Sequence, residues 1–421
     1  MNRYVKSALA LWVLAGCAGA AEHAGLPVAG EQLYALPPEV QVRTVLRALP
    51  QLRESGLHGE LAASERNRLD AGPGEWVLRA GVARRTADGQ RYREQEAGIE
   101  RSVRWFGKAA QDRAIGDKGL EVAEAQRADA WHEAGRALMR DWYDALRAQA
   151  TVQRLAEQHA LVEQLQDIAA RRVKAGDAPA LELLQAQTEV LRSRAALELA
   201  DKELAQALQL LATMYPGLPP PQNLRADGLP EPQAAPIAML DDVARLMHDN
   251  HELELAQEEA QWQQLKAKRA SSDRMPDPTL GVHMSRERDG QERLLGFSVS
   301  MPLPGAARSA EASSAAVRAR MADERVAQVR RQVELDARRT VSEQRQSYQI
   351  WRSLGQVAAQ SRRQADLMER AYQAGECTLS EALLSRRQAH DATLAAQTAQ
   401  IGALAAAART ELDAHTLWVA D

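Results

Sequence analysis

Residues 74–108 read GEWVLRAGVARRTADGQRYREQEAGIERSVRWFGK, and residues 276–307 repeat their plan as PDPTLGVHMSRERDGQERLLGFSVSMPLPGAA. Each stretch has an alternating run, a turn containing Asp-Gly-Gln and a second alternating run, and each leads into a long Ala-rich helical pattern. Asp-Gly between two alternating runs is a strong β-hairpin signal. The chain is therefore expected to be a β-hairpin followed by a long helical hairpin, written twice.

The helical patterns that follow the hairpins are long. Residues 108–174 contain no proline, and a helix of this length would extend about 100 Å at 1.5 Å per residue. After a turn at residues 175–177, a heptad places large aliphatic residues at one position and small residues at another. Its members are Leu183, Val190, Leu197, Leu204 and Leu211, with Ala186, Ser193, Ala200, Ala207 and Met214. Such a seam predicts close packing of two antiparallel helices.

Matching glycines indicate that the two halves arose by duplication. Gly98 and Gly296 lie 198 residues apart in the strands, and Gly176 and Gly375 lie 199 residues apart in the turns between the long helices. Offsets that agree across a whole unit are typical of a structural repeat rather than of chance similarity between Ala-rich segments.

The chain is expected to divide where its composition changes. Residues 216–236 contain seven prolines, which predicts a stiff extended linker between the halves. Short helical patterns precede each hairpin, at 40–49 and 51–69, with Pro50 as a break, and at 237–247 and 252–271. The expected domains are a signal peptide (1–16), a first repeat (17–215, with β-hairpin 75–105 and helical hairpin 107–214), the Pro-rich linker (216–236), and a second repeat (237–421, with β-hairpin 278–302 and helical hairpin 305–418). The long helices of the second repeat are expected at 306–372 and 379–417.

The first residues resemble a bacterial lipoprotein signal. Arg3 and Lys6 form a basic region, an apolar stretch follows, and the small residues 14–16 lead to Cys17. Such a segment is a secretory signal and is too short to stay as a membrane span. The resemblance implies lipidation of Cys17 and, because Ala18 rather than aspartate follows, sorting to the outer membrane. An ordinary signal peptide with a chance cysteine is the alternative.

The composition and the motifs exclude several classes of function. A formal net charge of −4 gives no basic footprint for nucleic acid. No HExxH, GxSxG or phosphate-loop motif is present, so we expect no enzyme activity, no cofactor and no metal site. His248, His251, Glu252 and Glu254 could be read as a metal cluster. They lie where a helix begins, however, and exposed polar residues are expected there.

The alternating runs would each present an apolar face. These faces consist of Trp76, Leu78, Ala80 and Val82 in the first run and of Leu295, Phe297, Val299 and Met301 in the last. Trp105 and Phe106 end the second run, where an aromatic girdle at a membrane interface would lie. Arg101 interrupts the apolar face of that run. It implies either a slip of the strand register or a position outside the hydrocarbon layer.

Over nearly its entire mature length the chain resembles the TolC-like outer-membrane efflux factors. The resemblance is carried by the lipoprotein signal, the two hairpins, residues 296–303 (GFSVSMPL) before the second long helix, and two matching turns. Residues 175–184 read AGDAPALELL at the first turn, and residues 374–383 read AGECTLSEAL at the second. No single motif is specific, but their order, spacing and duplication together are.

The resemblance implies a mainly α fold with a small β part. Three copies would form a homotrimer, with long antiparallel helical hairpins in an α-barrel across the periplasm. Four strands per chain would join one shared twelve-stranded outer-membrane β-barrel. Physics agrees independently, because four strands cannot close a barrel and open edges are not tolerated in lipid. The implied location is the bacterial outer membrane, with a lipid anchor at Cys17 and helices extending into the periplasm.

The resemblance also assigns a role to the turns between the long helices, which would dock on the periplasmic adaptor of a pump. The matching positions are Arg171, Ala175, Gly176, Asp177, Ala178, Arg370, Ala374, Gly375, Glu376 and Cys377. The glycines would allow a positive φ at a helix end, which is also their purely structural explanation. Asp366 and Glu369 nearby would form acidic rings that narrow the pore and favour cations.

The implied function is a passive exit duct, the outer-membrane component of a tripartite efflux system driven by an inner-membrane pump through the adaptor. The first hairpin, from Glu75-Trp76 to Gly107-Lys108, looks most like that of the CzcC-like branch, which serves RND-type pumps for heavy-metal cations. One alternative is a duct for drugs or for type I protein secretion. Another is a lipid-anchored periplasmic coiled-coil scaffold without a pore, which would have no use for the two hairpins.

Overall fold

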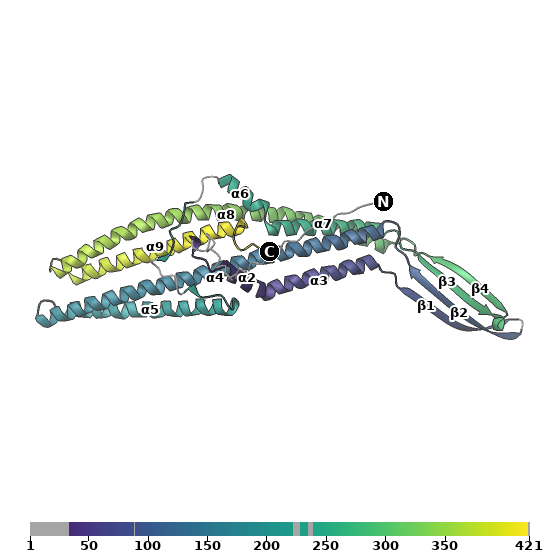
Figure 1. The fold of residues 1–421 in the computed structure, drawn as a ribbon, viewed down its shortest axis with the longest axis horizontal. Coiled ribbons are helices and arrows are strands. Elements are labelled where there is room, and N and C mark those ends of the chain that lie inside the picture. Colours follow the sequence, from purple (N-terminus) through teal and green to yellow (C-terminus); the bar gives the residue numbers. More distant parts are fainter. Residues whose placement is uncertain (1–32, 88, 222–227, 235–238, 420–421) are drawn as a thin grey trace, which may run out of the picture.

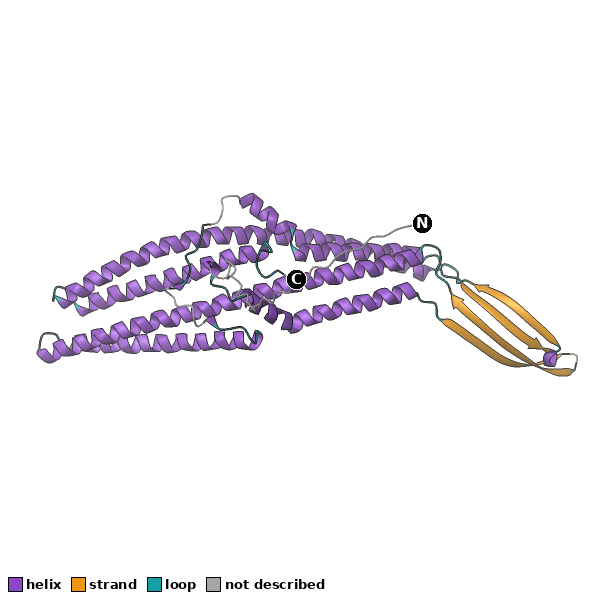
Figure 2. Ribbon diagram, viewed as in Figure 1, coloured by secondary structure: helices purple, strands orange, loops and turns teal. Residues whose placement is uncertain are grey.

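A computed structural model describes residues 33–87, 89–221, 228–234 and 239–419. The molecule is an elongated rod, with a four-stranded sheet at one end and two turns between long helices at the other (Figure 1). Helices form most of the rod between these ends (Figure 2). In the part of the chain that is described, no helix combines the length and the apolar character that a membrane span requires. The predicted signal peptide and Cys17 lie outside the described residues.

The two halves contain matching helices. The first half has α2 (Glu39–Ala48), α3 (Pro50–Ala71), α4 (Lys108–Ala175) and α5 (Ala180–Met214), and the second has α6 (Met239–His248), α7 (His251–Ser272), α8 (Ala306–Gln373) and α9 (Leu379–Asp413). Corresponding helices have equal lengths of 10, 22, 68 and 35 residues. Equal lengths at every position agree with the duplication that the glycine offsets indicate.

The four strands form one antiparallel sheet in the order β1-β2-β3-β4. Their bounds are β1 (Trp76–Ala87), β2 (Gln90–Ser102), β3 (Thr279–Glu287) and β4 (Glu292–Ser300). The first hairpin turns at Gly89 with a φ of 75°, and a short 3₁₀ helix, η3 (Arg288–Gly290), closes the second. Both hairpins are shorter than expected, because strand pairing ends at Ser102 and Ser300. Direct pairing of β2 with β3 joins the two halves.

The helix break predicted at Pro50 is present, whereas the end of the last helix differs from the expectation. α2 ends at Ala48 and Pro50 occupies the first turn of α3, where the N–H that proline lacks would have no helical partner. The last helix ends at Asp413, before the expected Leu417, and His415 takes a left-handed φ of 55°. The chain then folds back, and the carbonyl oxygen of Trp418 accepts a hydrogen bond from Trp131 Nε1 at 2.7 Å.

The long helices pack as a layer one helix thick. Near the sheet the order is α3, α4, α7, α8, and toward the turns it is α5, α4, α9, α8. α4 and α8 run the full length of this layer (Figure 1). Small residues make the close contacts that the heptad predicts for α5, since Ala186 and Ser193 are buried, and Ala382 and Ala389 are buried in the same way on α9. α8 forms one edge of the layer, and α3 with α5 forms the other.

The largest hydrophobic core lies at mid-length, where α2, α5 and α9 meet α4. Its fully buried side chains include Leu46, Leu138, Leu146, Ile401 and Leu404. Two aromatic residues of α4 anchor the start of the described chain there. Trp142 Nε1 donates to the carbonyl of Ala35 at 2.9 Å, and the Tyr143 hydroxyl donates to that of Tyr34 at 2.6 Å. Buried Trp and Tyr thus have polar partners, as such side chains need.

Candidate functional site

The register of the sheet gathers its apolar side chains on one face. Directly paired residues point to the same side of a sheet, so each cross-strand row can be assigned to a face. One face carries Trp76, Leu78, Ala80, Val82, Ala97, Ile99, Leu280, Val282, Met284, Leu295, Phe297 and Val299. The opposite face carries Arg79, Arg85, Glu94, Glu96, Glu100, His283, Ser285, Glu287 and Ser298. The sheet is therefore mainly apolar on one side, where Arg84, Gln95, Arg286 and Arg293 lie toward the hairpin turns, and mainly polar on the other, which also carries Val77 and Leu294.

The apolar face is open to its surroundings. Leu78 is 78% exposed, Leu295 77% and Phe297 67%. Among the described residues no helix lies over the sheet, which projects beyond the helical layer (Figure 2). Soluble monomeric proteins rarely expose a contiguous apolar patch of this kind. Alternation of an exposed apolar face with a polar one matches a strand that has lipid on one side and water on the other.

Arg101 does not shift the register. Pairing between β1 and β2 continues without a break from Trp76–Arg101 to Ala87–Gln90. The guanidinium of Arg101 lies 5.3 Å from the ring centroid of Trp76, and its Nε donates to the carbonyl of Gly74 at 2.9 Å. Both contacts lie at the end of the sheet next to the helices. The alternative of a register slip is therefore wrong, and the charge sits at the margin of the apolar face.

The polar face of the sheet contains two ion pairs and a close contact at one glycine. Arg79 pairs with Glu100 at 2.5 Å, and Arg85 lies 3.5 Å from Glu94. The imidazole of His283 lies so close to Gly296 that a Cβ there would overlap the ring. Glycine in the middle of a strand often marks such a close approach.

Both the sheet and the helical layer have unpaired edges. β1 and β4 are the outer strands of the sheet, and within the described chain nothing pairs with their outer edges. The edge helix α8 exposes a series of apolar side chains: Val317, Met321, Leu335, Ile350, Val357 and Leu367. The opposite edge exposes Leu57 and Leu61 of α3 and Leu184, Leu191, Leu199 and Leu210 of α5. Sequence reasoning missed these edges, although leucines outside the buried heptad positions were a signal for them.

A buried ionic cluster joins the sheet to the helices, and it too was missed from the sequence. Lys108, only 1% exposed, lies at the start of α4, and its Nζ is 2.8 Å from carboxylate oxygens of both Asp273 and Asp277. The same Nζ donates to the carbonyl of Met275 at 2.7 Å. Beside it, Asp112 accepts from Arg104 at 3.1 Å and from Arg269 at 2.5 Å. These contacts link the segment after β2 and the start of α4 in the first half with α7 and the segment before β3.

The predicted docking residues lie together at the far end of the rod. Arg171 and Ala175 end α4 and precede a turn of Gly176, Asp177 and Ala178, while Arg370 lies in the last turn of α8 before Ala374, Gly375, Glu376 and Cys377. Gly176 and Gly375 have φ values of 81° and 78°, so both adopt the left-handed conformation that favours glycine. Cys377 is half-buried, and burial followed by nearby Glu381 and Glu376 raises the pKa of its thiol. The other turn residues except Ala178 are exposed.

A buried tyrosine holds the two turns side by side. Tyr372 of α8 is 1% exposed, and the guanidinium of Arg172 lies 4.7 Å from its ring centroid. The Tyr372 hydroxyl lies 3.3 Å from Glu182 of α5, and the Ser380 hydroxyl of α9 donates to Gln185 at 2.9 Å. Leu181, Leu184 and Leu384 line an open groove between α5 and α9 next to these contacts.

The two acids proposed to line the pore have a partner within their own hairpin. Arg386 of α9 donates to Asp366 at 2.9 Å and to Glu369. The guanidinium offsets much of the negative charge of the two carboxylates. This pairing weakens the prediction that Asp366 and Glu369 form acidic rings that favour cations.

A cluster of histidines lies at mid-length. The ring centroids of His132 and His415 are 5.0 Å apart, and those of His251 and His415 are 4.5 Å apart. Burial lowers the pKa of His132, whose Nε2 lies 3.2 Å from Asp413. Burial alone would raise the pKa of Asp413, but His132, Arg136 and Arg409 together hold it well below its usual range. Across the described positions, no set of three or more His, Cys, Asp or Glu is arranged to hold a metal ion.

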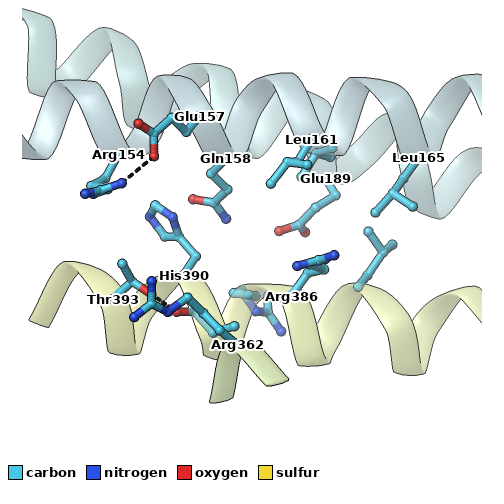
Figure 3. A pocket seen from close by; sticks show the side chains of 14 residues that line it. Arg154, Glu157, Gln158, Leu161, Leu165, Glu189, Arg362, Arg386, His390 and Thr393 are labelled. Atoms are coloured by element: carbon cyan, nitrogen blue, oxygen red, sulfur yellow. Dashed lines mark hydrogen bonds and ion pairs between the residues drawn. The ribbon is translucent and has the colours of Figure 1, made fainter. Parts of the chain in front are cut away.

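A cavity with both polar and apolar walls lies between the two helical hairpins nearer the turns (Figure 3). Arg154, Glu157 and Gln158 reach into it from α4, and Arg386 and His390 reach into it from α9 (Figure 3). Arg154 donates to Glu157 at 2.8 Å and to Gln397 at 2.7 Å. Burial lowers the pKa of His390.

The fold matches solved structures of outer membrane channels, whereas comparison with family models and with curated protein sequences gives no match. The CmeC outer membrane channel of Campylobacter jejuni aligns with a TM-score of 0.73 and 13% identity, over 91% of this chain and 86% of that one. The open-state MtrE outer membrane channel of Neisseria gonorrhoeae gives 0.73 and 14%, over 91% and 90%. The outer membrane protein VceC of Vibrio cholerae gives 0.72 and 15%, over 89% and 95%.

At these identities the likeness concerns the fold alone. The chain shares with these channels a mainly helical architecture of long hairpins and a four-stranded antiparallel sheet. The fold class predicted from the sequence is therefore confirmed: this chain has the fold of an outer-membrane channel protomer.

Proposed function

We propose that the chain is one protomer of an exit duct in the bacterial outer membrane, the outer component of a tripartite efflux system. The observation that carries this proposal is the four-stranded sheet, which is apolar on one exposed face, polar on the other and unpaired at both edges. A membrane-spanning sheet must close on itself so that every backbone group has a partner. Such closure leaves the apolar face toward lipid and the polar face toward a water-filled passage.

Closure requires several copies of the chain. β1 of one copy would pair with β4 of the next, and the apolar edge of α8 would pack on α3 and α5 of the next copy. These contacts join different surfaces, and such head-to-tail interfaces form a ring when the rotation closes. A homotrimer, in which three copies supply twelve strands, is the assembly that the likeness to outer-membrane channels supports. The unpaired edges of the sheet and those of the helical layer would then be covered in the same assembly.

The turns at the far end would dock a periplasmic adaptor, which connects the duct to an inner-membrane pump. Arg171 and Arg370 occupy matching positions there, and each uses Nε only for a carbonyl four residues back, at 3.2 Å. Both arginines are exposed, and neither guanidinium has a carboxylate partner among the described residues. The groove of Leu181, Leu184 and Leu384 adds an apolar surface beside them. Charged and apolar groups in one exposed place suit a helical partner.

For the exported substrate we propose heavy-metal cations, on the strength of the sequence resemblance of the first hairpin. The pairing of Arg386 with Asp366 and Glu369 gives this choice no support from the turns. Deletion of the gene should raise sensitivity to heavy-metal salts and leave drug sensitivity unchanged. Sensitivity to drugs alone, or loss of a secreted protein, would keep the duct and replace the substrate.

Two adjacent leucines of β4 test the membrane sheet. Leu295 lies on the apolar face and Leu294 on the polar face, and they are 77% and 51% exposed. We expect Leu295→Lys to destabilise the inserted sheet by about 2–4 kcal/mol if it lies near the bilayer centre, whereas Leu294→Lys should be tolerated. The measurement is the yield of detergent-resistant, heat-modifiable oligomer in the outer-membrane fraction. Equal yields from both variants would contradict a lipid-facing sheet and favour a scaffold without a pore.

Photo-crosslinking tests the docking end. A photoreactive residue at Leu184, next to the turns, should capture a periplasmic adaptor in intact cells, identified by mass spectrometry. The same residue at Val317, near the sheet end of α8, should instead capture a second copy of this chain. Capture of the adaptor at neither position, with normal oligomer, would keep the channel and remove docking at these turns.

A further inference from the structure

The cavity between the two helical hairpins has room for a ligand. It lies among α4, α5, α8 and α9, and its volume of about 170 Å³ holds several water molecules. Leu161, Val162, Leu165 and Leu383 line one part of it. The remaining wall is polar, and its charged side chains are Arg154, Arg362, Arg386, Arg387, Glu157 and Glu189. Four guanidinium groups therefore face two carboxylates.

Both carboxylates already have cationic partners. Glu157 accepts from Arg154 at 2.8 Å, and Glu189 accepts from Arg192 at 2.6 Å. Arg386 is engaged by Asp366 and Glu369 through its terminal nitrogens. By contrast, Arg362 and Arg387 have no carboxylate partner in the described parts of the chain. The wall thus keeps a positive excess after its internal ion pairs are counted.

Two buried nitrogen atoms in the same wall lack hydrogen-bond partners. They are Nε of Arg386 and Nε2 of His390, which have almost no accessible surface, so a ligand in the cavity reaches them after a small shift of these side chains. Figure 3 shows both side chains between the α4 and α9 helices, from which the cavity is built. Buried polar atoms in native proteins nearly always have a partner, and an exception often marks the place of an ion or water. A guanidinium Nε–H can only donate, so its missing partner must be an acceptor.

We propose that this cavity binds a small inorganic oxyanion of the size of phosphate. Its oxygen atoms would accept from Arg386 Nε and His390 Nε2, and its charge would be balanced by Arg362 and Arg387. Arginine suits this task because its planar donors match the geometry of oxyanions. The proposal goes beyond the duct function and does not depend on it.

Because the cavity lies between the two helical hairpins, a bound ligand would affect how firmly they are held together. It would touch α4 and α5 of one hairpin and α8 and α9 of the other, and so hold the two hairpins in their present relation. A ligand that binds only the folded arrangement stabilises it in proportion to its concentration. Occupancy would therefore raise the temperature at which the hairpins separate.

The test uses the purified, assembled full-length protein in detergent. Thermal unfolding is followed while sodium phosphate is titrated at constant ionic strength, with sodium chloride as the reference salt. We expect a saturable rise in the melting temperature with phosphate alone. Arg387→Gln and His390→Gln should each weaken phosphate binding at least tenfold. Arg363→Gln, an exposed arginine of α8 outside the cavity, should leave binding unchanged and serves as the matched control.

Two results would overturn the proposal. One is an equal rise with chloride, which would indicate a general salt effect. The other is unchanged phosphate binding by both Arg387→Gln and His390→Gln. Circular dichroism and the size of the oligomer show whether each variant is folded. If Arg387→Gln misfolds, Arg387→Lys keeps the charge but loses the planar donors, and it should bind phosphate more weakly than the wild type.

Discussion

At the scale of single residues, Lys108 is the buried cation that joins the four-stranded sheet to the helices. Replacing it with methionine leaves Asp273 and Asp277 without their shared partner. Breaking a buried ion pair from one side typically costs about 3–5 kcal/mol, and we expect the lower end because Asp273 is 40% exposed. Thermal unfolding of the purified protein measures the loss. Lys202→Met, at an exposed position of α5, is the control, and equal melting temperatures for the two variants would contradict a role of Lys108 at the junction.

His132 makes the mid-length core sensitive to acid. Burial lowers its pKa below the ordinary value of 6.5, so the unfolded chain binds more protons than the folded chain between the two pKa values. Stability contributed by neutral His132 is therefore fully present above pH 6.5 and is lost as the pH falls toward the lowered pKa. We expect the melting temperature to be lower at pH 5 than at pH 7.5.

His132→Gln should reduce this pH dependence, because glutamine can still donate to Asp413 but does not titrate. His248→Gln, at a side chain that is 84% exposed, is the control and should keep the wild-type dependence. An identical slope for wild type and His132→Gln would assign the acid sensitivity to other groups. His415, whose pKa burial also lowers, would be the next candidate.

At the scale of elements, a substitution on the exposed edge of α8 tests whether this helix is an interface between copies of the chain. Ile350 is 53% exposed on this helix in the single protomer. We expect Ile350→Glu to abolish the oligomer, because a charge would be buried between α8 and the next copy. Gln349→Glu, one residue earlier at an exposed position, should keep it. Light scattering in detergent distinguishes the two, and an intact Ile350→Glu oligomer would show that α8 is not an interface.

The helices and strands also show which sequence patterns predicted the structure correctly. The heptads and the Asp-Gly turns predicted the helices and hairpins, because helix period and strand alternation are local properties of a sequence. The positive φ of Gly176 and Gly375 in the turns between the long helices was predicted for the same reason. The predicted end of the last helix at residue 417 was wrong. The packing of Trp418 against the mid-length core, rather than helix propensity, decides where the chain leaves α9.

At the scale of the whole molecule, closure of the sheet would turn its polar face toward a common passage. Glu96 lies on this face. We expect Glu96→Lys to shift the ion preference of the channel toward anions, because each copy replaces a negative charge by a positive one near the ion path. The reversal potential in planar bilayers under a salt gradient measures the shift. An unchanged potential with normal conductance would place this face away from the passage.

The sequence by itself determined the order and type of the elements, the duplication and the alternation of apolar strands. These features depend on residues close together in the chain or on a fixed offset between two copies. Tertiary structure alone decided which side chains meet across the halves. Lys108 finds its carboxylates more than 160 positions away, and Arg386 finds Asp366 and Glu369 only because α8 and α9 pack side by side. The cavity of Arg387 and His390 likewise exists only where two hairpins stand apart, and no local pattern encodes a space between helices.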